Sequence, residues 1–333
     1  MLTQRLPRVS LIIAGAVVCA LAGCSSSPSS EKEVTVRNCG AEVTVVQPPH
    51  RVFVSDSAPI ATLSHLGVLD TVTARAGVYP PSYFDASTQH ALDAIPSLTD
   101  RVDAKGHLQI SKEQVLADNP DLVLGSTDTV NRQTLDSHNI PVIEEPAFCD
   151  AIKGSASWND VWDQISLYGT IFDRQQQASS YIDELKKQLA HNTDGAAGRN
   201  RSVAVMYPEV GTPTAYAYGS TSMSHPIVES LGLRNVFADQ DKRVFEVSAE
   251  ELVARNPDVI IALYTEGDPN TVVKAIENQQ GASSVTAVKN KTILPLLLNY
   301  AEPATPLAVE GVGKINAFLR SDSPARPTEG KQP

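Results

Sequence analysis

The chain has 333 residues, of which 42% are hydrophobic and 20% charged, and its formal net charge is −11. This composition is typical of a folded globular protein and excludes disorder as the main state, and the length suffices for two domains of ordinary size. The acidic balance, without a dense run of lysine or arginine, argues against nucleic acid as a partner.

The N-terminus has the pattern of an export signal rather than of folded structure. A basic start precedes an apolar stretch at residues 11–20, which is too short to span a bilayer comfortably, since a helix needs about 20 apolar residues. Leu21-Ala22-Gly23-Cys24 resembles the lipobox of bacterial lipoproteins; the alternative is an ordinary signal peptide with an incidental cysteine. We expect a signal peptide over 1–23, lipidation at Cys24 and a flexible tether over 24–33.

Export would leave two cysteines, Cys39 and Cys149, because Cys19 lies in the signal and Cys24 is the lipidation site. Two thiols in an exported chain suggest one disulfide, which would tie the expected first strand to the end of the first lobe. A metal site is the alternative. Neither thiol stands in a Cys-x-x-Cys motif or beside clustered histidines, so no metal site is predicted.

The first part of the chain alternates predicted strands and helices. Residues 34–46 predict a hairpin around an Asn38-Cys39-Gly40 turn. Strands are then expected at 51–54, 72–75, 121–125 and 140–144, and helices at 58–66, 112–118 and 129–138, with a loop between 75 and 112. Such alternation implies a mainly parallel sheet with helices on both faces.

Two long helices are predicted after residue 157, with apolar side chains at three- and four-residue spacing and Asp173 as the N-cap between them. The second, 173–192, would span about 30 Å, enough to cross between two lobes. The remaining chain predicts strands at 202–207 and 291–296, helices at 224–231, 270–278 and 305–319, a loop over 208–223 and a disordered tail over 321–333.

One pattern occurs twice. Residues 110–125 (ISKEQVLADNPDLVLG) return 137 positions later at 247–262 (VSAEELVARNPDVIIA). Each copy has a serine N-cap signal (Ser111 or Ser248), a glutamate in the first helical turn, an Asn-Pro-Asp turn and an aliphatic strand. Two similar units suggest two lobes related by an approximate internal symmetry, with a cleft between them.

Together these features resemble class III substrate-binding proteins of ABC importers, which capture ferric siderophores, haem or cobalamin. The resemblance rests on the lipobox, segments 49–54 and 63–67, both Asn-Pro-Asp units, the connecting helix and the final helix, and it covers residues 34–320. It implies an α/β fold of two Rossmann-like lobes with mainly parallel sheets, 34–172 and 200–320, joined by a single long helix at 173–192. The ligand cleft would lie between the lobes.

The resemblance also implies partners. Family members dock onto the permease through one acidic residue in each lobe, and the matching residues are Glu113 and Glu250. Carboxylates there could form bidentate pairs with arginine. The simpler interpretation is that both stabilise helix dipoles, by about 0.3–1 kcal/mol, and Glu251 could replace Glu250. We expect a monomer, lipid-anchored on the extracytoplasmic face of the bacterial cell membrane, with an ABC-importer permease as partner.

Candidate cleft positions are the loops at the carboxyl ends of strands, where open α/β sheets bind ligands. Seven of the 9 tyrosines occur there, which suits flat aromatic or chelate ligands. The predicted ligand-binding residues are Tyr79, Tyr83, His107, Ser126, Tyr207, Tyr216, Tyr218, Arg243, Tyr264 and Tyr300, and segments 55–57 and 126–128 are further candidates.

A ferric siderophore is the preferred ligand, because Arg243, Arg75 and Arg101 could embrace an anionic chelate. Haem is the alternative, with His107 facing Tyr218 as the axial pair. Cobalamin fits less well, since its family relatives favour tryptophan in the cleft and both tryptophans here lie on a core-facing helix stripe.

The chain contains no Gly-x-Ser-x-Gly elbow, P-loop or His-Glu-x-x-His motif, so we expect neither an enzyme nor an intrinsic cofactor. A cell-surface adhesion or signalling lipoprotein is the alternative from a different functional class.

Overall fold

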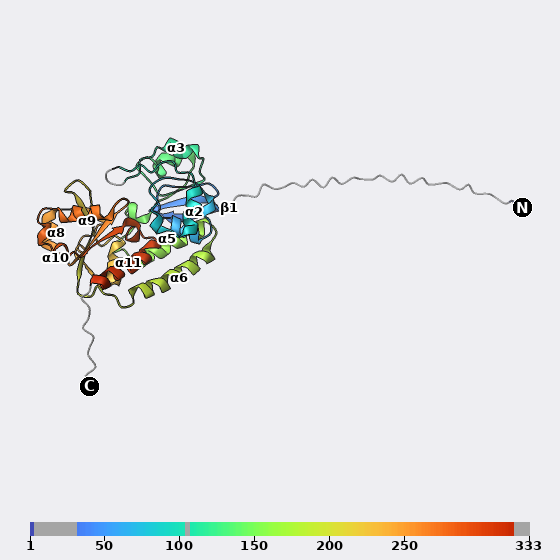
Figure 1. Cartoon of the computed structure of the whole chain (residues 1–333). Coiled ribbons are helices and arrows are strands. Elements are labelled where there is room, and N and C mark those ends of the chain that lie inside the picture. The colour runs from blue at the N-terminus through green and yellow to red at the C-terminus, as the bar shows by residue number, and fades with distance from the viewer. Residues whose placement is uncertain (3–31, 104–106, 323–333) are drawn as a thin grey trace, which may run out of the picture. The chain divides into compact units, whose positions relative to one another are not determined.

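The computed structural model describes residues 1–2, 32–103 and 107–322, and the chain from Lys32 onward forms one compact unit (Figure 1). The predicted signal peptide, Cys24 and most of the tether and tail lie outside the described residues. Two predicted boundaries shift, because Lys32 and Glu33 belong to the first strand and the last helix continues to Asp322. Within the described residues no helix is long and apolar enough to cross a membrane.

An antiparallel hairpin comes first, and it confirms the sequence prediction. Strand β1 (Lys32–Asn38) pairs with β2 (Ala41–Gln47). The two residues between them, Cys39 and Gly40, both have positive φ, 51° and 76°, as a two-residue turn that matches the twist of the strands requires. Alternate valines of the hairpin are buried in the main hydrophobic core.

The N-terminal half (residues 32–172) contains a four-stranded parallel sheet in the order β4-β3-β5-β6. Its strands are β3 (Val52–Val54), β4 (Val72–Arg75), β5 (Leu122–Leu124) and β6 (Val142–Ile143). Its connecting helices are α1 (Ile60–His65), α2 (Ala86–Ala94), α3 (Lys112–Ala117) and α4 (Arg132–Leu135). Sequence analysis missed α2, because only two of its side chains, Thr88 and Leu92, are buried and its apolar period is therefore weak.

The C-terminal half (residues 202–322) contains a six-stranded sheet in the order β10-β8-β7-β11-β12, with β9 also paired to β7. The strands are β7 (Ser202–Pro208), β8 (Ala215–Tyr218), β9 (Arg234–Asn235), β10 (Val244–Val247), β11 (Val259–Tyr264) and β12 (Ile293–Leu297). The pairings of β7, β9, β11 and β12 are parallel, whereas β8 runs antiparallel to its neighbours β7 and β10.

The predicted loop over 208–223 is therefore wrong in its middle. Four residues are too few for a clear alternation in the sequence, and β8 forms because its backbone completes the ladder between β7 and β10. The helices of this half are α7 (Ser224–Ser230), α8 (Ala249–Arg255), α9 (Pro269–Glu277), α10 (Thr286–Lys289) and α11 (Leu307–Asp322).

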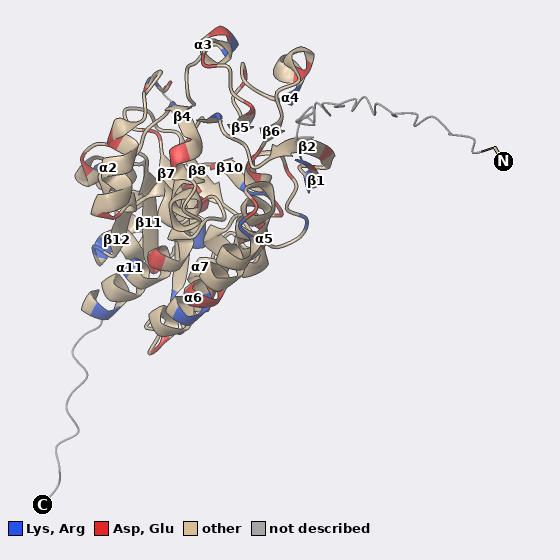
Figure 2. Ribbon diagram, turned by 90° about the vertical axis from the view of Figure 1, so that its right-hand side faces the viewer, with Lys and Arg blue, Asp and Glu red and all other residues tan. Residues whose placement is uncertain are grey.

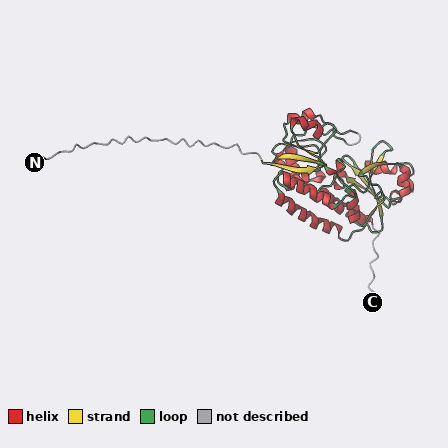
Figure 3. Cartoon of the chain, turned by 180° about the vertical axis from the view of Figure 1, so that it is seen from behind, coloured by secondary structure: helices red, strands yellow, loops and turns green. Residues whose placement is uncertain are grey.

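Two long helices stand between the halves in the sequence, α5 (Trp158–Ile171) and α6 (Gln175–Thr193), and they lie side by side (Figure 3). Gly169 permits this approach, because a Cβ at that position would lie 2.5 Å from the Cβ of Ala178. Asp173 is not the N-cap, since it has a φ of 54° and α6 begins only after Arg174. Helix α6 also packs against α11. It therefore contacts α5, which comes after the N-terminal sheet in the chain, and α11, which comes after the C-terminal sheet.

The hydrophobic core explains why the halves form one unit. One cluster of buried side chains includes residues of both sheets and of α5, α6 and α11. The opposite face of each sheet has a separate hydrophobic cluster, and every residue of that cluster belongs to the same half as the sheet. The outer face of α6 has interspersed acidic and basic positions (Figure 2), as expected for a solvated helix surface.

The serine caps predicted from the repeat are confirmed. The Ser111 hydroxyl accepts a hydrogen bond from the Gln114 backbone N–H, and the Gln114 side chain accepts one from the Ser111 N–H. The Ser248 hydroxyl accepts a hydrogen bond from the Glu251 N–H at 3.1 Å. In each copy the serine hydroxyl therefore accepts a hydrogen bond from the third backbone N–H of the helix, which would otherwise have no partner within the helix.

The Asn-Pro-Asp turns do more than end a helix. Asn119 and Asn256 adopt left-handed backbones, with φ of 52° and 42°, which asparagine tolerates. The Asp121 carboxylate then accepts hydrogen bonds from two successive backbone N–H groups just before β3, at 2.7 and 3.0 Å. The Asp258 carboxylate accepts bonds from the N–H and hydroxyl of Ser202 at the start of β7, at 2.7 and 2.8 Å. In both halves the motif's aspartate holds the neighbouring strand.

Candidate functional site

A cavity of about 1140 Å³ is lined by residues of both halves. Its wall in the N-terminal half is built from the segments that follow β3, β4, β5 and β6. The C-terminal half contributes the residues that follow β11 and β12, together with the turn that leads into β10. This is the arrangement expected of open α/β sheets, which bind ligands beyond the carboxyl ends of their strands.

Four of the ten predicted ligand-binding residues line this cavity: Tyr83, His107, Ser126 and Arg243. The further candidate segments 55–57 and 126–128 also line it. The remaining six residues are not among those that line it, and they are Tyr79, Tyr207, Tyr216, Tyr218, Tyr264 and Tyr300. Four of them, Tyr207, Tyr216, Tyr218 and Tyr264, stand within paired strands rather than in loops.

The expected arginine cluster does not form on the cavity wall. Arg75 lies with its guanidinium 4.7 Å from the ring centre of Tyr79 and donates to the carbonyl of Leu92. Tyr79 itself donates its hydroxyl to backbone carbonyls at 3.0 and 3.3 Å. Arg101 is also absent from the lining, so Arg243 is the one arginine that the described residues bring to the cavity.

At the cavity wall, hydrogen bonds join the two halves. The Asn299 backbone N–H donates to the Tyr83 hydroxyl at 2.9 Å, and its side-chain amide donates to the Ser57 hydroxyl at 3.0 Å. The Tyr300 hydroxyl donates to the carbonyl of Ser82, and the rings of Tyr83 and Tyr300 pack edge to face, 5.1 Å apart. Burial raises the pKa of Tyr300 to about 12, so this phenol remains a donor at neutral pH. These contacts hold the cavity in a formed state.

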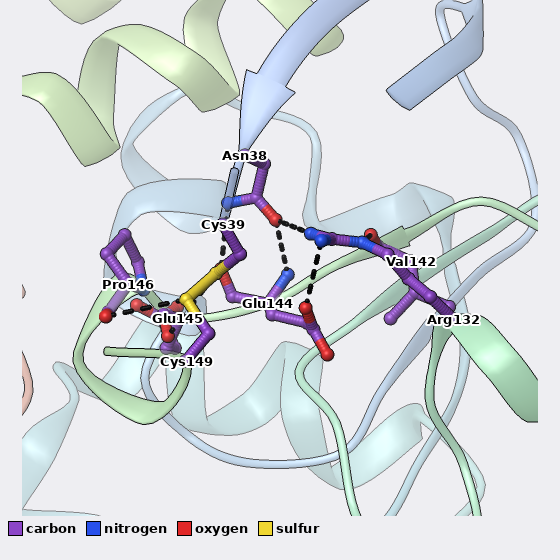
Figure 4. Close-up of polar contacts among 8 residues, drawn as sticks. All are labelled: Asn38, Cys39, Arg132, Val142, Glu144, Glu145, Pro146 and Cys149. Carbon is purple, nitrogen blue, oxygen red and sulfur yellow. Dashed lines mark hydrogen bonds and ion pairs between the residues drawn. A yellow bond between two sulfur atoms is a disulfide. The ribbon is translucent and has the colours of Figure 1, made fainter. Parts of the chain in front are cut away.

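A cross-linked network holds the segment 144–154, which supplies much of the N-terminal wall (Figure 4). Cys39, in the turn of the hairpin, forms a disulfide with Cys149. The Asn38 side chain exchanges two hydrogen bonds of 2.9 Å with the backbone of Glu144. Arg132 pairs with the Glu144 carboxylate at 3.1 Å and also donates to the side-chain oxygen of Asn38, Oδ1. The hairpin therefore anchors a wall that is distant in sequence.

Phe148 and Arg243 meet across the cavity from opposite halves. Phe148 is 48% exposed, unusual for a large apolar side chain in this structure, and the Arg243 guanidinium lies 5.1 Å from its ring centre. Sequence analysis did not identify Phe148; its position beside Cys149 was the available signal. An exposed aromatic ring stacked with a cation gives the cavity an apolar surface for a ligand.

Arg243 is held by a buried glutamate. The Glu302 carboxylate lies 3.4 Å from the guanidinium and is 1% exposed. It also accepts hydrogen bonds from the Ser222 hydroxyl at 2.7 Å and the Met223 N–H at 2.8 Å. Burial raises the pKa of Glu302, whereas Arg243 and the two donors lower it. The positive charge of Arg243 is thus largely balanced within the protein.

Two carboxyl groups of the N-terminal half have raised pKa values. Asp56 follows β3 and lines the cavity; desolvation raises its pKa to about 6, against the lowering effect of a 2.7 Å hydrogen bond from the Ala58 N–H. Glu145 is buried, does not line the cavity, and accepts hydrogen bonds from Gln164 at 2.9 Å and Tyr168 at 3.0 Å. Desolvation, with the nearby charge of Asp56, raises the pKa of Glu145 to about 8.

Glu113 and Glu250, the two predicted docking residues, are exposed in the first turns of α3 and α8. Figure 1 shows these helices at separate outer ends of the molecule, away from α6. No ion pair within 4 Å is found for either carboxylate among the described residues, whereas Glu251 pairs with Arg255 at 3.2 Å. Glu250 is therefore the more available of the two neighbouring glutamates.

The residues considered for tetrapyrroles are not gathered at the cavity. His107 lines it with a 65% exposed side chain and lies 3.4 Å from Asp103, while Tyr218 is 5% exposed and does not line it. Trp158 and Trp162 stack on each other along α5. In the part of the chain that the structure describes, no group of three or more His, Cys, Asp or Glu side chains is arranged to hold a metal ion.

Comparisons with known proteins agree with this geometry. Residues 52–296 match the family model described as "Periplasmic binding protein". A curated relative, the uncharacterised ABC transporter substrate-binding lipoprotein YvrC of Bacillus subtilis strain 168, is 22% identical over 238 residues, which are 69% of this chain and 72% of the relative.

Two solved structures are also similar. One, an ABC-type Fe3+-hydroxamate transport system from Saccharomonospora viridis DSM 43017, is 45% identical with a TM-score of 0.82, covering 86% of this chain and 98% of that one. The other, the periplasmic haem-binding protein RhuT from Roseiflexus sp. RS-1, shares the fold with a TM-score of 0.64 at 17% identity, covering 82% of this chain and 98% of that one.

Proposed function

The chain belongs to the periplasmic binding protein family of ABC importers, and on that premise we propose that it captures a ferric hydroxamate siderophore and delivers it to a permease. The family consists of solute-binding transport proteins rather than enzymes. Its members act outside the cytoplasm and bind small molecules.

The cavity carries the proposal. Its volume of about 1140 Å³ is slightly above the usual range for ligand pockets, about 300–1,000 Å³, which leaves room for a folded metal chelate. Its wall combines an exposed aromatic ring, Phe148, with hydroxyl, carboxyl and cationic groups. The 45% identity to a structure described as an Fe3+-hydroxamate transport system supports the hydroxamate class among ferric chelates.

The bonds between Asn299, Tyr83 and Ser57 support capture by a largely pre-formed site. They link the two halves directly, through groups of the protein itself. A site that is already ordered loses little conformational entropy on binding, which favours tight capture at low ligand concentration. We therefore expect a small change of shape when the ligand binds.

A binding screen tests the ligand assignment. The mature protein is titrated with ferric hydroxamates, ferric catecholates, ferric citrate, haemin and cobalamin, and quenching of intrinsic fluorescence is followed. Saturable quenching by ferric hydroxamates at the lowest concentrations is expected. A Soret band on mixing with haemin, with no response to ferric hydroxamates, would replace this proposal with haem binding. No response to any of the five classes would favour an adhesion or signalling role.

We further propose that Glu113 and Glu250 dock the loaded protein onto the permease. Both are exposed and unpaired among the described residues, and carboxylates of this kind form strong bidentate pairs with arginine. The double variant Glu113→Ala/Glu250→Ala is expected to lose most of the uptake while its ligand affinity is unchanged. Glu251→Ala is the matched control, because Glu251 is engaged by Arg255. Unchanged uptake in the double variant would contradict the docking role.

Lipid anchoring at Cys24 and a monomeric state complete the proposal. Lipidation would hold the mature protein at the outer face of the bacterial cell membrane, with a small-molecule chelate and a permease as its partners. Cys24→Ala is expected to release the protein from the membrane fraction. Retention of the variant in that fraction, in the absence of the permease, would contradict the anchor.

A further inference from the structure

The charges on the cavity wall are predominantly negative. Five acidic residues line it: Asp56, Asp128, Glu144, Asp150 and Asp241. The lining cations are Lys153, Lys242 and Arg243. The whole chain adds an acidic background, with a formal net charge of −11. Clefts lined by one sign of charge concentrate ligands of the opposite sign.

Internal ion pairs do not reverse this balance. Arg243 is paired with Glu302, which lies behind the wall, and Glu144 is paired with Arg132, which also does not line the cavity. These two pairs remove one positive and one negative charge from the wall. Four carboxyl groups then face two lysines, and the exposed Lys153 also donates to the carbonyl of Asp150 at 2.7 Å.

Asp56 and Glu144 are the partly buried carboxylates of the lining, whereas Asp128, Asp150 and Asp241 are exposed. Glu144 is already paired with Arg132, so Asp56, which follows the central strand β3, is the partly buried carboxylate that differs from the others. Its single hydrogen bond among the described residues comes from the Ala58 N–H, and no cation lies within 4 Å of it there. The protein also keeps space for this carboxylate. A Cβ at Gly125, whose φ is 89°, would lie 2.6 Å from the Asp56 Oδ2.

On the basis of the proposed function, we propose that the cavity selects ferric hydroxamates that carry a positively charged group, and that Asp56 is the carboxylate that pairs with that group. The iron core of a ferric trihydroxamate is electrically neutral, because three hydroxamate monoanions balance Fe3+. The ligand's net charge is then that of its pendant groups. A ferric tris-catecholate carries three negative charges, which the acidic wall repels.

The partly buried position of Asp56 makes it the residue expected to discriminate. Charge pairs removed from water interact more strongly than pairs at an exposed rim. Asp128 is exposed at the same wall and so offers a matched comparison. The other titratable groups near Asp56 are Glu145 and the phenols of Tyr79 and Tyr168. Arg75 stacks on the Tyr79 ring and, among the described residues, makes no ion pair with Asp56 within 4 Å.

The test uses two ligands that differ only in charge: a linear ferric trihydroxamate with a terminal ammonium, and the same chelate with that amine acetylated. The mature wild-type protein, Asp56→Asn and Asp128→Asn are titrated with each at pH 7.5. The wild type is expected to bind the ammonium form at least tenfold more tightly. Asp56→Asn should bind both forms equally, and Asp128→Asn should retain most of the preference. Thermal melting of each variant checks that it is folded.

The outcomes separate this inference from the function on which it rests. Equal affinity of the wild type for the two chelates, or tighter binding of a ferric tris-catecholate, overturns the inference and leaves siderophore capture standing. A preference that persists in folded Asp56→Asn overturns the role of Asp56. Binding of neither trihydroxamate overturns the proposed function. A second measurement needs no variant: the wild-type preference should decline between pH 7.5 and pH 5, and a constant preference contradicts the pairing with Asp56.

Discussion

The N-terminal and C-terminal halves each bury one glutamate beside the cavity, and they hold it differently. Glu145 is 2% exposed and receives hydrogen bonds from two neutral side chains, Gln164 and Tyr168. Glu302 is 1% exposed and receives an ion pair from Arg243 as well as two hydrogen bonds. The pKa of Glu145 rises to about 8, so this carboxyl is mainly protonated at neutral pH, whereas a cation opposes the rise at Glu302.

This difference shows how two similar scaffolds build unlike walls. The repeat provides the same helix caps and the same strand anchors in both halves. The N-terminal wall is held by a disulfide and by the network of Asn38, Arg132 and Glu144, whereas in the C-terminal half the buried Glu302 pairs with Arg243 and balances its charge. The internal symmetry therefore concerns the backbone, and each half carries its own chemistry.

The largest effect is expected from removing the covalent tie, which is present in the N-terminal half. Cys39 and Cys149 are 110 residues apart, so their disulfide restricts a long loop of the unfolded chain. Cys39→Ser/Cys149→Ser should lower the free energy of unfolding by about 2–5 kcal/mol. Denaturant unfolding of the two proteins measures the difference, and a reductant should destabilise the wild type alone. Equal midpoints without reductant would show that the disulfide contributes no stability.

The next largest effect is expected on the pH dependence of stability, and it compares the two buried glutamates. Glu145 has a folded-state pKa of about 8 and an ordinary value of 4.5, so between these values the folded state retains a proton that the unfolded state releases. Wild-type stability is therefore lost as pH rises through this range, and Glu145→Gln removes that loss. The variant should gain about 2–3 kcal/mol over the wild type between pH 5 and pH 7, at 1.4 kcal/mol per pH unit.

Denaturant unfolding at several pH values measures this gain, and parallel profiles for the two proteins would contradict it. Glu302→Gln is the comparison from the other half. The same substitution there leaves Arg243 without its carboxylate partner, so no similar gain is expected.

The smallest losses of stability are expected at the aspartates of the two Asn-Pro-Asp turns, and the loss should differ between the two copies of the repeat. Asp258→Ala leaves the N–H and hydroxyl of the buried Ser202 without their acceptor, at a cost of about 2 kcal/mol. Asp121→Ala frees two N–H groups of exposed residues, which water can satisfy, and should cost about 1 kcal/mol. Melting temperatures of the two variants rank the effects. A larger loss of melting temperature in Asp121→Ala than in Asp258→Ala would show that burial of the donors does not determine the size of the two effects.

Much of the fold was predictable because its signals are local. The Asn38-Cys39-Gly40 turn, the serine caps and the Asn-Pro-Asp turns act within a few residues of where they stand in the chain. The strands β3, β5, β7 and β11 were found as aliphatic runs, since a strand buried on both faces is apolar throughout. The family followed from the order of these elements, and residues 52–296 bear it out.

The sequence by itself thus determined the repeat, the α/β class and the importer family, and it indicated that the strand ends form the site. Only the tertiary structure decided which candidate side chains line the cavity: it keeps Asp56 of segment 55–57, adds Phe148, and places Tyr79 and Tyr218 away from the lining. The physical reason is that periodicity reports which face of one element is buried, whereas a cavity depends on how two sheets are placed against each other. The tertiary structure also decided the charge balance of the wall, because the ion-pair partners of Arg243 and Glu144 lie 59 residues and 12 residues away along the chain.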